Sequence, residues 1–91
     1  MTDSGPDPTI RELRQEISEV DRTIVAAVNA RLELVARLKR YKEEHGFAFL
    51  DPNRERALIE ELVRTNPGPL TAEGVRELST SLLELTKRHV Q

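Results

Sequence analysis

The chain contains no cysteine, no tryptophan, one tyrosine and two phenylalanines, and its two histidines lie far apart in the sequence. The absence of cysteine excludes disulfides and thiolate metal sites. His45 and His89 show no metal-ligand spacing, and the three aromatics (Tyr41, Phe47 and Phe49) are too few for a base-stacking platform. We therefore expect no metal centre.

Long apolar runs and an excess of one charge are also missing. No run approaches the length that crosses a membrane, and the polar residues 1–8 lack the basic and apolar regions of a secretory leader. Acidic and basic residues are interspersed, with a formal net charge of −2, which argues against a nucleic-acid binder. We expect a soluble, cytoplasmic protein that binds neither nucleic acid nor a membrane.

Residues 1–8 (MTDSGPDP) are polar and rich in proline and glycine, which predicts a disordered tail before a single domain at 9–91. Thr9 and Glu12 fit a capping box. No glycine or proline then interrupts the chain before Gly46, which predicts one helix of about 35 residues, well above the usual length of about 11–12. Its apolar stripe consists of Ile10, Leu13, Ile17, Val20, Ile24, Val28, Val35 and Leu38.

Two shorter helices are expected after a short apolar connector. Asp51-Pro52 is an acidic cap followed by proline and predicts a helix that runs to about Thr65. The segment Asn66-Pro67-Gly68-Pro69 breaks the chain, and Thr71 is expected to cap a third helix. The residues predicted to face inward are Ala57, Leu58, Ile59, Leu62, Val75, Leu78, Leu82, Leu83 and Leu85.

The sequence thus predicts an all-α fold of three helices with one very long first helix. A 91-residue chain buries only a modest core, so oligomerisation is the remaining way to stabilise it. The following helices are too short to cover the stripe of the first one. A second copy of the chain is the simplest partner.

Three cations are spaced along the predicted first helix. Arg14 lies at the edge of the stripe, and Arg31 occupies a stripe position, about 25 Å away along a helix axis. Arg31 and Lys42 face nearly the same way at about 16 Å. One small ligand cannot reach both arginines of one chain, whereas an antiparallel second copy would bring its own Arg14 to the open side of Arg31. The spacing therefore predicts a symmetric dimer with two cation-rich sites.

Each charged residue also has an ordinary explanation when it is taken alone. Surface arginines often lay their stems along a core edge, and Lys42 suits a helix C-terminus. Asp51 is explained as a helix cap, and Arg54 and Glu55 as residues of a first helical turn. Only the joint spacing of these residues favours a binding site.

The chain resembles the AroQ-class chorismate mutases from about Thr9 to its C-terminus. The resemblance lies in residues 13–17 with Asp21, 30–34, 39–42, 51–56 (DPNRER) and the 66–69 loop with the helix after it. The last two segments are most similar to mutase domains that are fused to, or accompany, synthases of the first shikimate-pathway step. The order and spacing of the segments make chance similarity improbable.

The resemblance implies an intertwined antiparallel homodimer in which both chains build each of two active sites. It implies that chorismate is converted to prephenate by an intramolecular [3,3] (Claisen) rearrangement in aromatic amino-acid biosynthesis, without a cofactor. A shikimate-pathway synthase is an expected partner. Arg31 and the partner's Arg14 would bind the two carboxylates of chorismate, and Lys42 would reach the ether oxygen and an adjacent carboxylate.

The resemblance also implies roles for the residues after the first helix. Asp51 and Glu55 would hold the ring hydroxyl, with Asp51 acting through its backbone, and Arg54 would support the carboxylate side. Thr86 stands where the family often has a small hydroxyl residue or glycine. The apolar walls would be formed by Leu38, Leu58 and Leu83.

One position departs from the family pattern. Many members have Gln or Glu one turn after the position of Thr86, where that side chain hydrogen-bonds the ether oxygen. Here Val90 aligns with it, and Gln91 follows. Three explanations stay open: Gln91 supplies the donor, Lys42 acts alone, or a partner protein orders this terminus.

Other functions are compatible with parts of the pattern. An isochorismate-pyruvate lyase or an aminodeoxychorismate mutase would use a similar pocket, but Asp51 and Glu55 favour the chorismate mutase. A non-catalytic dimerisation or regulatory module is a further alternative, in which the arginines would form interfacial salt bridges with Glu16 or Glu33.

Overall fold

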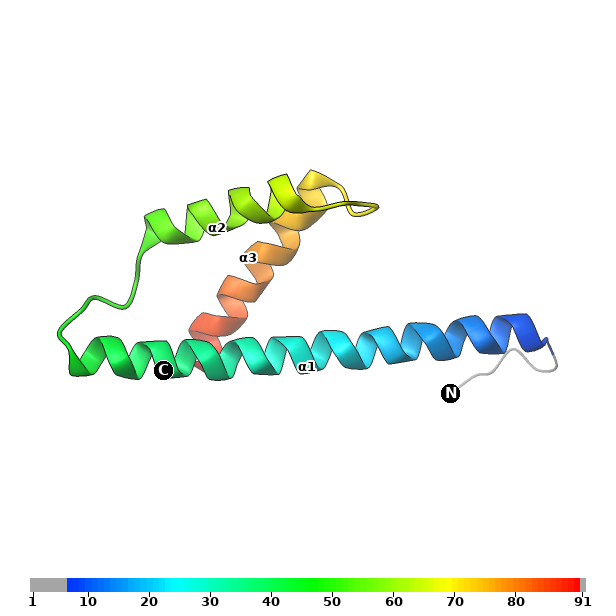
Figure 1. The fold of residues 1–91 in the computed structure, drawn as a ribbon, viewed down its shortest axis with the longest axis horizontal. Helices are drawn as coiled ribbons and strands as arrows, with labels where there is room; N and C mark the ends of the chain where they lie inside the picture. Colours follow the sequence, from blue (N-terminus) through cyan, green and yellow to red (C-terminus); the bar gives the residue numbers. More distant parts are fainter. Residues whose placement is uncertain (1–6, 91) are drawn as a thin grey trace. The chain divides into compact units, whose positions relative to one another are not determined.

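The structure, a computed structural model, describes residues 7–90. It contains three helices, α1 (Pro8–Glu44), α2 (Pro52–Thr65) and α3 (Ala72–His89), and residues 7–90 include no strand (Figure 1). The prediction of an all-helical chain with three helices is confirmed. None of these helices is long and apolar enough to cross a membrane. Most of the predicted tail, residues 1–6, lies outside the described part of the chain.

The first helix begins earlier than the sequence predicted. Asp7 is its cap, because the Asp7 carboxylate accepts hydrogen bonds from the backbone N–H of Thr9 at 2.9 Å and of Ile10 at 3.2 Å. The predicted capping box at Thr9 was therefore wrong. The physical reason is the Asp7-Pro8 pair, which combines an acidic acceptor with a proline at the first helical position. The same pair starts α2, where the Asp51 carboxylate accepts from the Arg54 N–H at 3.1 Å.

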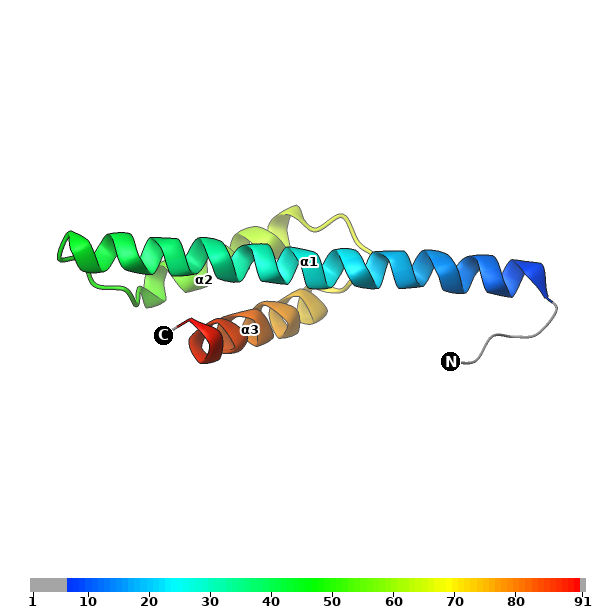
Figure 2. The ribbon, with the colours of Figure 1, turned by 90° about the horizontal axis from the view of Figure 1, so that it is seen from below.

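The end of α1 is determined by Gly46. This residue has a φ of +76°, a left-handed conformation that glycine adopts without steric cost. The chain reverses there, and the Phe47 N–H donates to the Lys42 carbonyl at 2.8 Å, as in a Schellman motif. In Figure 2 the connector leaves the end of α1 and returns beside it toward α2. The reversal places residues 47–50 next to the last turns of α1.

The helices α2 and α3 pack against each other. Val75 of α3 is buried, and further apolar residues of the two helices are half-buried: Leu58, Ile59, Val63, Leu82, Leu83 and Leu85. The predicted inward positions Ala57, Leu62 and Leu78 are exposed, so those assignments were wrong. The reason is that one narrow face of each helix suffices for this packing. Thr71 caps α3 as predicted, by accepting from the Gly74 N–H at 3.0 Å.

One ion pair joins α2 to α3 on the surface. The Arg76 guanidinium contacts both carboxylate oxygens of Glu60, at 2.6 and 3.2 Å. Hydrogen bonding and the positive charge of Arg76 lower the pKa of Glu60. Because the pair is exposed to water, we expect it to fix the crossing of the helices more than to stabilise them.

The chain divides into two compact units, residues 1–31 and 32–91, and α1 contributes to both. Within α1 the predicted stripe separates into two sets. Val28 and Val35 are half-buried, together with Leu32, Lys39 and Lys42. The other stripe residues are 40% to 59% exposed, and Leu34 and Tyr41 belong with them. The expectation of a single stripe was therefore wrong in this respect.

The exposed set of α1 follows a heptad pattern, which we call the heptad seam. Its spacing alternates between three and four residues without interruption, and a strict seven-residue repeat is typical of a helix that supercoils with another. Ala27 and Arg31 complete the pattern at two of its positions. The seam consists of Ile10, Leu13, Ile17, Val20, Ile24, Ala27, Arg31, Leu34, Leu38 and Tyr41.

A polar side chain, Ser79, lies on the buried face of α3. It is 4% exposed, and its hydroxyl has no hydrogen-bond partner among the described residues. A buried hydroxyl without a partner costs free energy because it has lost its hydrogen bonds to water. Ser79→Ala is therefore expected to raise the free energy of unfolding by about 1 kcal/mol.

Urea denaturation at fixed protein concentration measures this effect. Ser81→Ala is the matched control, because Ser81 lies on the same helix and is exposed, so it reports the helix propensity of alanine alone. An equal gain in both variants, or a loss in Ser79→Ala, would contradict the explanation from the unpaired hydroxyl.

Candidate functional site

Lys42 lies in the compact unit formed by residues 32–91. This lysine is half-buried in the last turn of α1, and its ammonium donates to the Phe49 carbonyl at 3.3 Å. The ammonium also lies 6.0 Å from the centroid of the Phe49 ring. Lys42 is thus held against the connector that leads to α2.

The start of α2 brings three of the predicted site residues into one helical turn. The Asp51 carboxylate is engaged with the Arg54 N–H, and the Asp51 carbonyl accepts from the Glu55 N–H at 3.1 Å. Glu55 is half-buried, whereas Asp51 and Arg54 are exposed. The Asp51 carboxylate and carbonyl are thus both engaged in the first turn of α2.

The last turns of α3 contribute Thr86 and Val90, which are 7% and 8% exposed. The Thr86 hydroxyl donates to the Leu82 carbonyl at 2.8 Å, and the Val90 N–H donates to the Thr86 carbonyl at 2.8 Å. Val90 ends the helix as its C-cap and is buried on the same helix face as Thr86. Gln91, the other candidate for the missing donor, lies outside the described residues.

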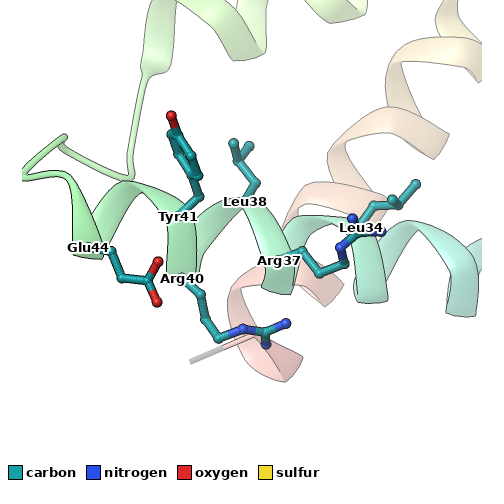
Figure 3. Close-up of a pocket in the computed structure, with 6 residues that line it drawn as sticks. All are labelled: Leu34, Arg37, Leu38, Arg40, Tyr41 and Glu44. Carbon is teal, nitrogen blue, oxygen red and sulfur yellow. The ribbon is translucent and has the colours of Figure 1, made fainter.

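The three predicted apolar wall residues differ in burial. Leu58 and Leu83 are half-buried, whereas Leu38 is 48% exposed. Leu38 lies in an open depression of about 480 Å³ on α1 that is lined by Leu34, Arg37, Leu38, Arg40, Tyr41 and Glu44. Figure 3 shows Leu38 and Tyr41 pointing to one side of the helix and Arg40 and Glu44 to the other. Three of the lining residues, Leu34, Leu38 and Tyr41, belong to the heptad seam.

The two predicted arginines belong to the other compact unit, residues 1–31. Arg14 is exposed, and Arg31 is half-buried at its seam position. A second open depression, of about 370 Å³, lies in this unit and is lined by Leu13, Glu16, Ile17, Val20 and Asp21. Both depressions are therefore bordered by seam residues.

Phe49 contacts Lys42 and was not among the residues that the sequence predicted for the site. Its carbonyl and its ring both contact Lys42, whereas its place in the sequence indicates only an apolar connector. A signal was available in the sequence, because a glycine three residues earlier allows the chain to reverse over Lys42.

The residues of this unit therefore offer a lysine ammonium, a half-buried carboxylate, a helix N-terminus and half-buried leucines. The family model described as chorismate mutase type II matches residues 13–91, which include every site residue named above. The chain belongs to the chorismate mutase type II family.

Solved structures of family members agree with this assignment. The chain is similar to the chorismate mutase of Thermus thermophilus in form I, with a TM-score of 0.82 and 32% identity, covering 86% of this chain and 98% of that one. Form II of the same protein gives a TM-score of 0.79 and 33% identity, covering 91% of this chain and 99% of that one.

Two curated relatives are larger proteins. The T-protein of Haemophilus influenzae is 35% identical over 51 residues, which are 56% of this chain and 14% of that protein. The bifunctional chorismate mutase/prephenate dehydratase of Aquifex aeolicus is 29% identical over 87 residues, which are 87% of this chain and 24% of that protein. The chain thus spans at most about a quarter of the length of these curated relatives.

Proposed function

We propose that the protein is a chorismate mutase that converts chorismate to prephenate and serves aromatic amino-acid biosynthesis. The observation that carries this proposal is the family match across residues 13–91, which includes the cations, the carboxylate and the helix start of the candidate site. These site residues do not include a nucleophile with an adjacent base, and an intramolecular [3,3] rearrangement needs no nucleophile.

The reaction makes two demands on the protein. The flexible dianion must be folded into its reactive chair, and negative charge must be stabilised on the ether oxygen as the C–O bond breaks. Arginine forks suit the first demand because they fix the orientation of a carboxylate. A lysine ammonium suits the second as a compact charge. We assign the carboxylates to Arg31 and the partner's Arg14, and the ether oxygen to Lys42.

The remaining residues complete the pocket in this proposal. Glu55 and the Asp51 backbone hold the ring hydroxyl, and Arg54 supports the carboxylate side. Thr86 is assigned to the substrate side of α3, and Val90 or Gln91 to the position beside the ether oxygen. The apolar walls are assigned to Leu38, Leu58 and Leu83.

An antiparallel homodimer through α1 is the second part of the proposal. The heptad seam is 40% to 59% exposed at its large apolar residues, which is typical of a helix face that packs against another chain. A second copy is the occupant that we propose, because one antiparallel register pairs every seam position with another. In it, Ile10, Leu13 and Ile17 pack against the partner's Tyr41, Leu38 and Leu34.

Charge complementarity supports the same register. Glu16 and Arg37 occupy the same heptad position, three heptads apart, and each borders one of the two open depressions. In the proposed register Glu16 lies beside the partner's Arg37. A shift of one heptad in one direction would instead bring Glu16 beside the partner's Glu44, which is repulsive.

The register also explains how two chains share one site. Arg14, Val35 and Lys42 are separated by multiples of seven residues, so they lie on the same flank of the seam. Equivalent flanks face each other in an antiparallel helix pair. The partner's Arg14 would therefore lie beside Val35, within one heptad of Lys42.

Cysteine cross-linking tests the dimer, and the absence of natural cysteine makes the test clean. The double variant Leu13→Cys/Leu38→Cys is expected to form a covalent dimer under mild oxidation. Ile10→Cys/Leu34→Cys and Ile17→Cys/Tyr41→Cys are the matched controls, because each pair would meet only in a register shifted by one heptad. Cross-linking of a control pair instead, or a monodisperse monomer in light scattering at micromolar concentration, would overturn the proposal.

The activity itself is tested by loss of chorismate absorbance with the purified protein and identification of the product. Prephenate is the expected product. Formation of salicylate from isochorismate would favour the lyase. An unchanged substrate together with an intact dimer would favour a non-catalytic dimerisation module.

A shikimate-pathway synthase is a further proposed partner, supported by the similarity of residues 51–56 and 66–69 to mutases that accompany such enzymes. Steady-state kinetics with and without the synthase test it. A rise in kcat/KM on addition of the synthase is expected, and identical kinetics would count against the partnership.

The missing donor at the end of α3 gives a prediction. If Val90 faces the ether oxygen, Val90→Gln adds a hydrogen bond that strengthens as charge develops there. It is then expected to raise kcat/KM by up to about a hundredfold. Val90→Leu is the matched control, because it changes size without adding a donor. No gain in Val90→Gln, combined with a large loss when Gln91 is deleted, would assign the role to Gln91.

A further inference from the structure

The connector between α1 and α2 is bound to Lys42 at two points. The Lys42 carbonyl accepts from the Phe47 N–H at 2.8 Å, and the Lys42 ammonium donates to the Phe49 carbonyl at 3.3 Å. The left-handed Gly46 allows this reversal. One residue therefore has both its backbone and its side chain fixed by the same short segment.

The ring of Phe49 adds a contact that its neighbour Phe47 does not make. Its centroid lies 5.9 Å from the Lys39 ammonium and 6.0 Å from the Lys42 ammonium, within the range of cation–π attraction. Phe49 is half-buried, whereas Phe47 is 61% exposed. Lys39 is also paired with Glu43 at 3.9 Å, whereas the hydrogen bond and the ring contact of the Lys42 ammonium among the described residues are both with Phe49.

We infer that Phe49 is a positioning residue that holds the Lys42 ammonium for the reaction, an inference that rests on the proposed function. An ammonium has three donors, and the Phe49 carbonyl takes one of them and leaves the others for the ligand. The ring restricts the flexible lysine stem, which otherwise loses much conformational freedom when it binds. Phe49 also lies two residues before Asp51, so it joins Lys42 to the start of α2.

Phe49→Leu is the main test, because leucine keeps the apolar bulk and the backbone carbonyl but removes the aromatic face. The expected result is a fall in kcat of about two- to fivefold with KM nearly unchanged, since a loosely held Lys42 fails mainly in the transition state. Phe49→Tyr is expected to restore kcat. Phe47→Leu is the matched control on the same connector and is expected to behave like the wild type.

Two further measurements separate positioning from folding. Pentafluorophenylalanine at position 49 keeps the shape of the ring but reverses its charge distribution, and it is expected to lower kcat as leucine does even if Phe49→Leu unfolds. The NMR signals of the lysine ε-CH2 groups report ring contact without substrate. The ε-CH2 signals of Lys39 and Lys42 are expected to change their chemical shifts in Phe49→Leu and to keep them in Phe47→Leu.

The outcomes distinguish this inference from the proposed function. If the wild-type protein leaves chorismate unchanged but Phe49→Leu still shifts the lysine NMR signals, the proposed function is overturned and the contact between Phe49 and Lys42 is kept. An active wild type in which Phe49→Leu and Phe47→Leu have the same kcat would overturn the positioning role. A change in KM alone would overturn it too.

Discussion

Arg14→Ala and Arg31→Ala proteins, each inactive alone, are expected to regain activity when they are mixed. In the proposed dimer each site takes Arg31 from one chain and Arg14 from the other. A heterodimer then has one site with both defects and one site with neither. With free exchange of subunits, the mixture should reach about one quarter of the wild-type specific activity.

The single variants are expected to lose much activity because each removes one partner of a charged pair that the substrate completes. Such truncations cost about 2–5 kcal/mol, which corresponds to a loss in kcat/KM of about 30-fold to several thousandfold. Arg11→Ala is a useful control, because Arg11 is also an exposed arginine near the start of α1 but is not a seam or site residue. Its activity should match the wild type.

The mixing experiment also separates the proposed models. A site formed within one chain would show no recovery, because every chain in the mixture carries a defect. Mass spectrometry of an isotope-labelled partner shows whether subunits have exchanged. Absence of recovery after demonstrated exchange would contradict the shared site.

The sequence predicted the helices well because their boundaries depend on local chemistry. Asp51-Pro52, the 66–69 breaker and Thr71 act through their nearest neighbours, and the structure places helix ends at them. The start of α1 was predicted wrongly by choosing Thr9, although Asp7-Pro8 carries the same signal as Asp51-Pro52. Asp7 and Pro8 were assigned to the polar tail at residues 1–8, although they begin the helix.

The division of α1 into two faces was harder to predict. Val28 and Val35 satisfy the same helical spacing as Leu38, and periodicity alone assigns all of them to one stripe. Only the burial of Val28 and Val35, set against the exposure of Leu34 and Tyr41, separates the heptad seam from the other face. Tertiary packing therefore decides what the pattern leaves open.

The candidate site was predictable to different degrees. Asp51, Arg54 and Glu55 are brought together by one helical turn, so their proximity follows from the sequence. The contact of Lys42 with Phe49 depends on a chain reversal at Gly46, which a search for charged residues does not consider. The pairing of Arg31 with an arginine of another chain stays a prediction.

Lys42→Ala is expected to have the second large effect, a fall in kcat of about 10²- to 10³-fold. The reason is that Lys42 is the residue assigned to the ether oxygen, and Val90 supplies no hydrogen-bond donor from its side chain. Negative charge develops on that oxygen as the bond breaks, so the loss should be greater in the transition state than in the bound substrate. KM should change much less than kcat.

The neighbouring lysine provides the control. Lys39 lies one turn earlier, contacts the same ring at 5.9 Å and is also half-buried, but it is paired with Glu43. Lys39→Ala should therefore lower kcat only slightly. Equal losses in the two variants would mean that the positive charge around Phe49 acts as a whole, whereas a small loss in Lys42→Ala alone would place the cation that stabilises the ether oxygen elsewhere. The pair of variants thus tests whether catalysis depends on the placement of one ammonium group or on the local charge alone.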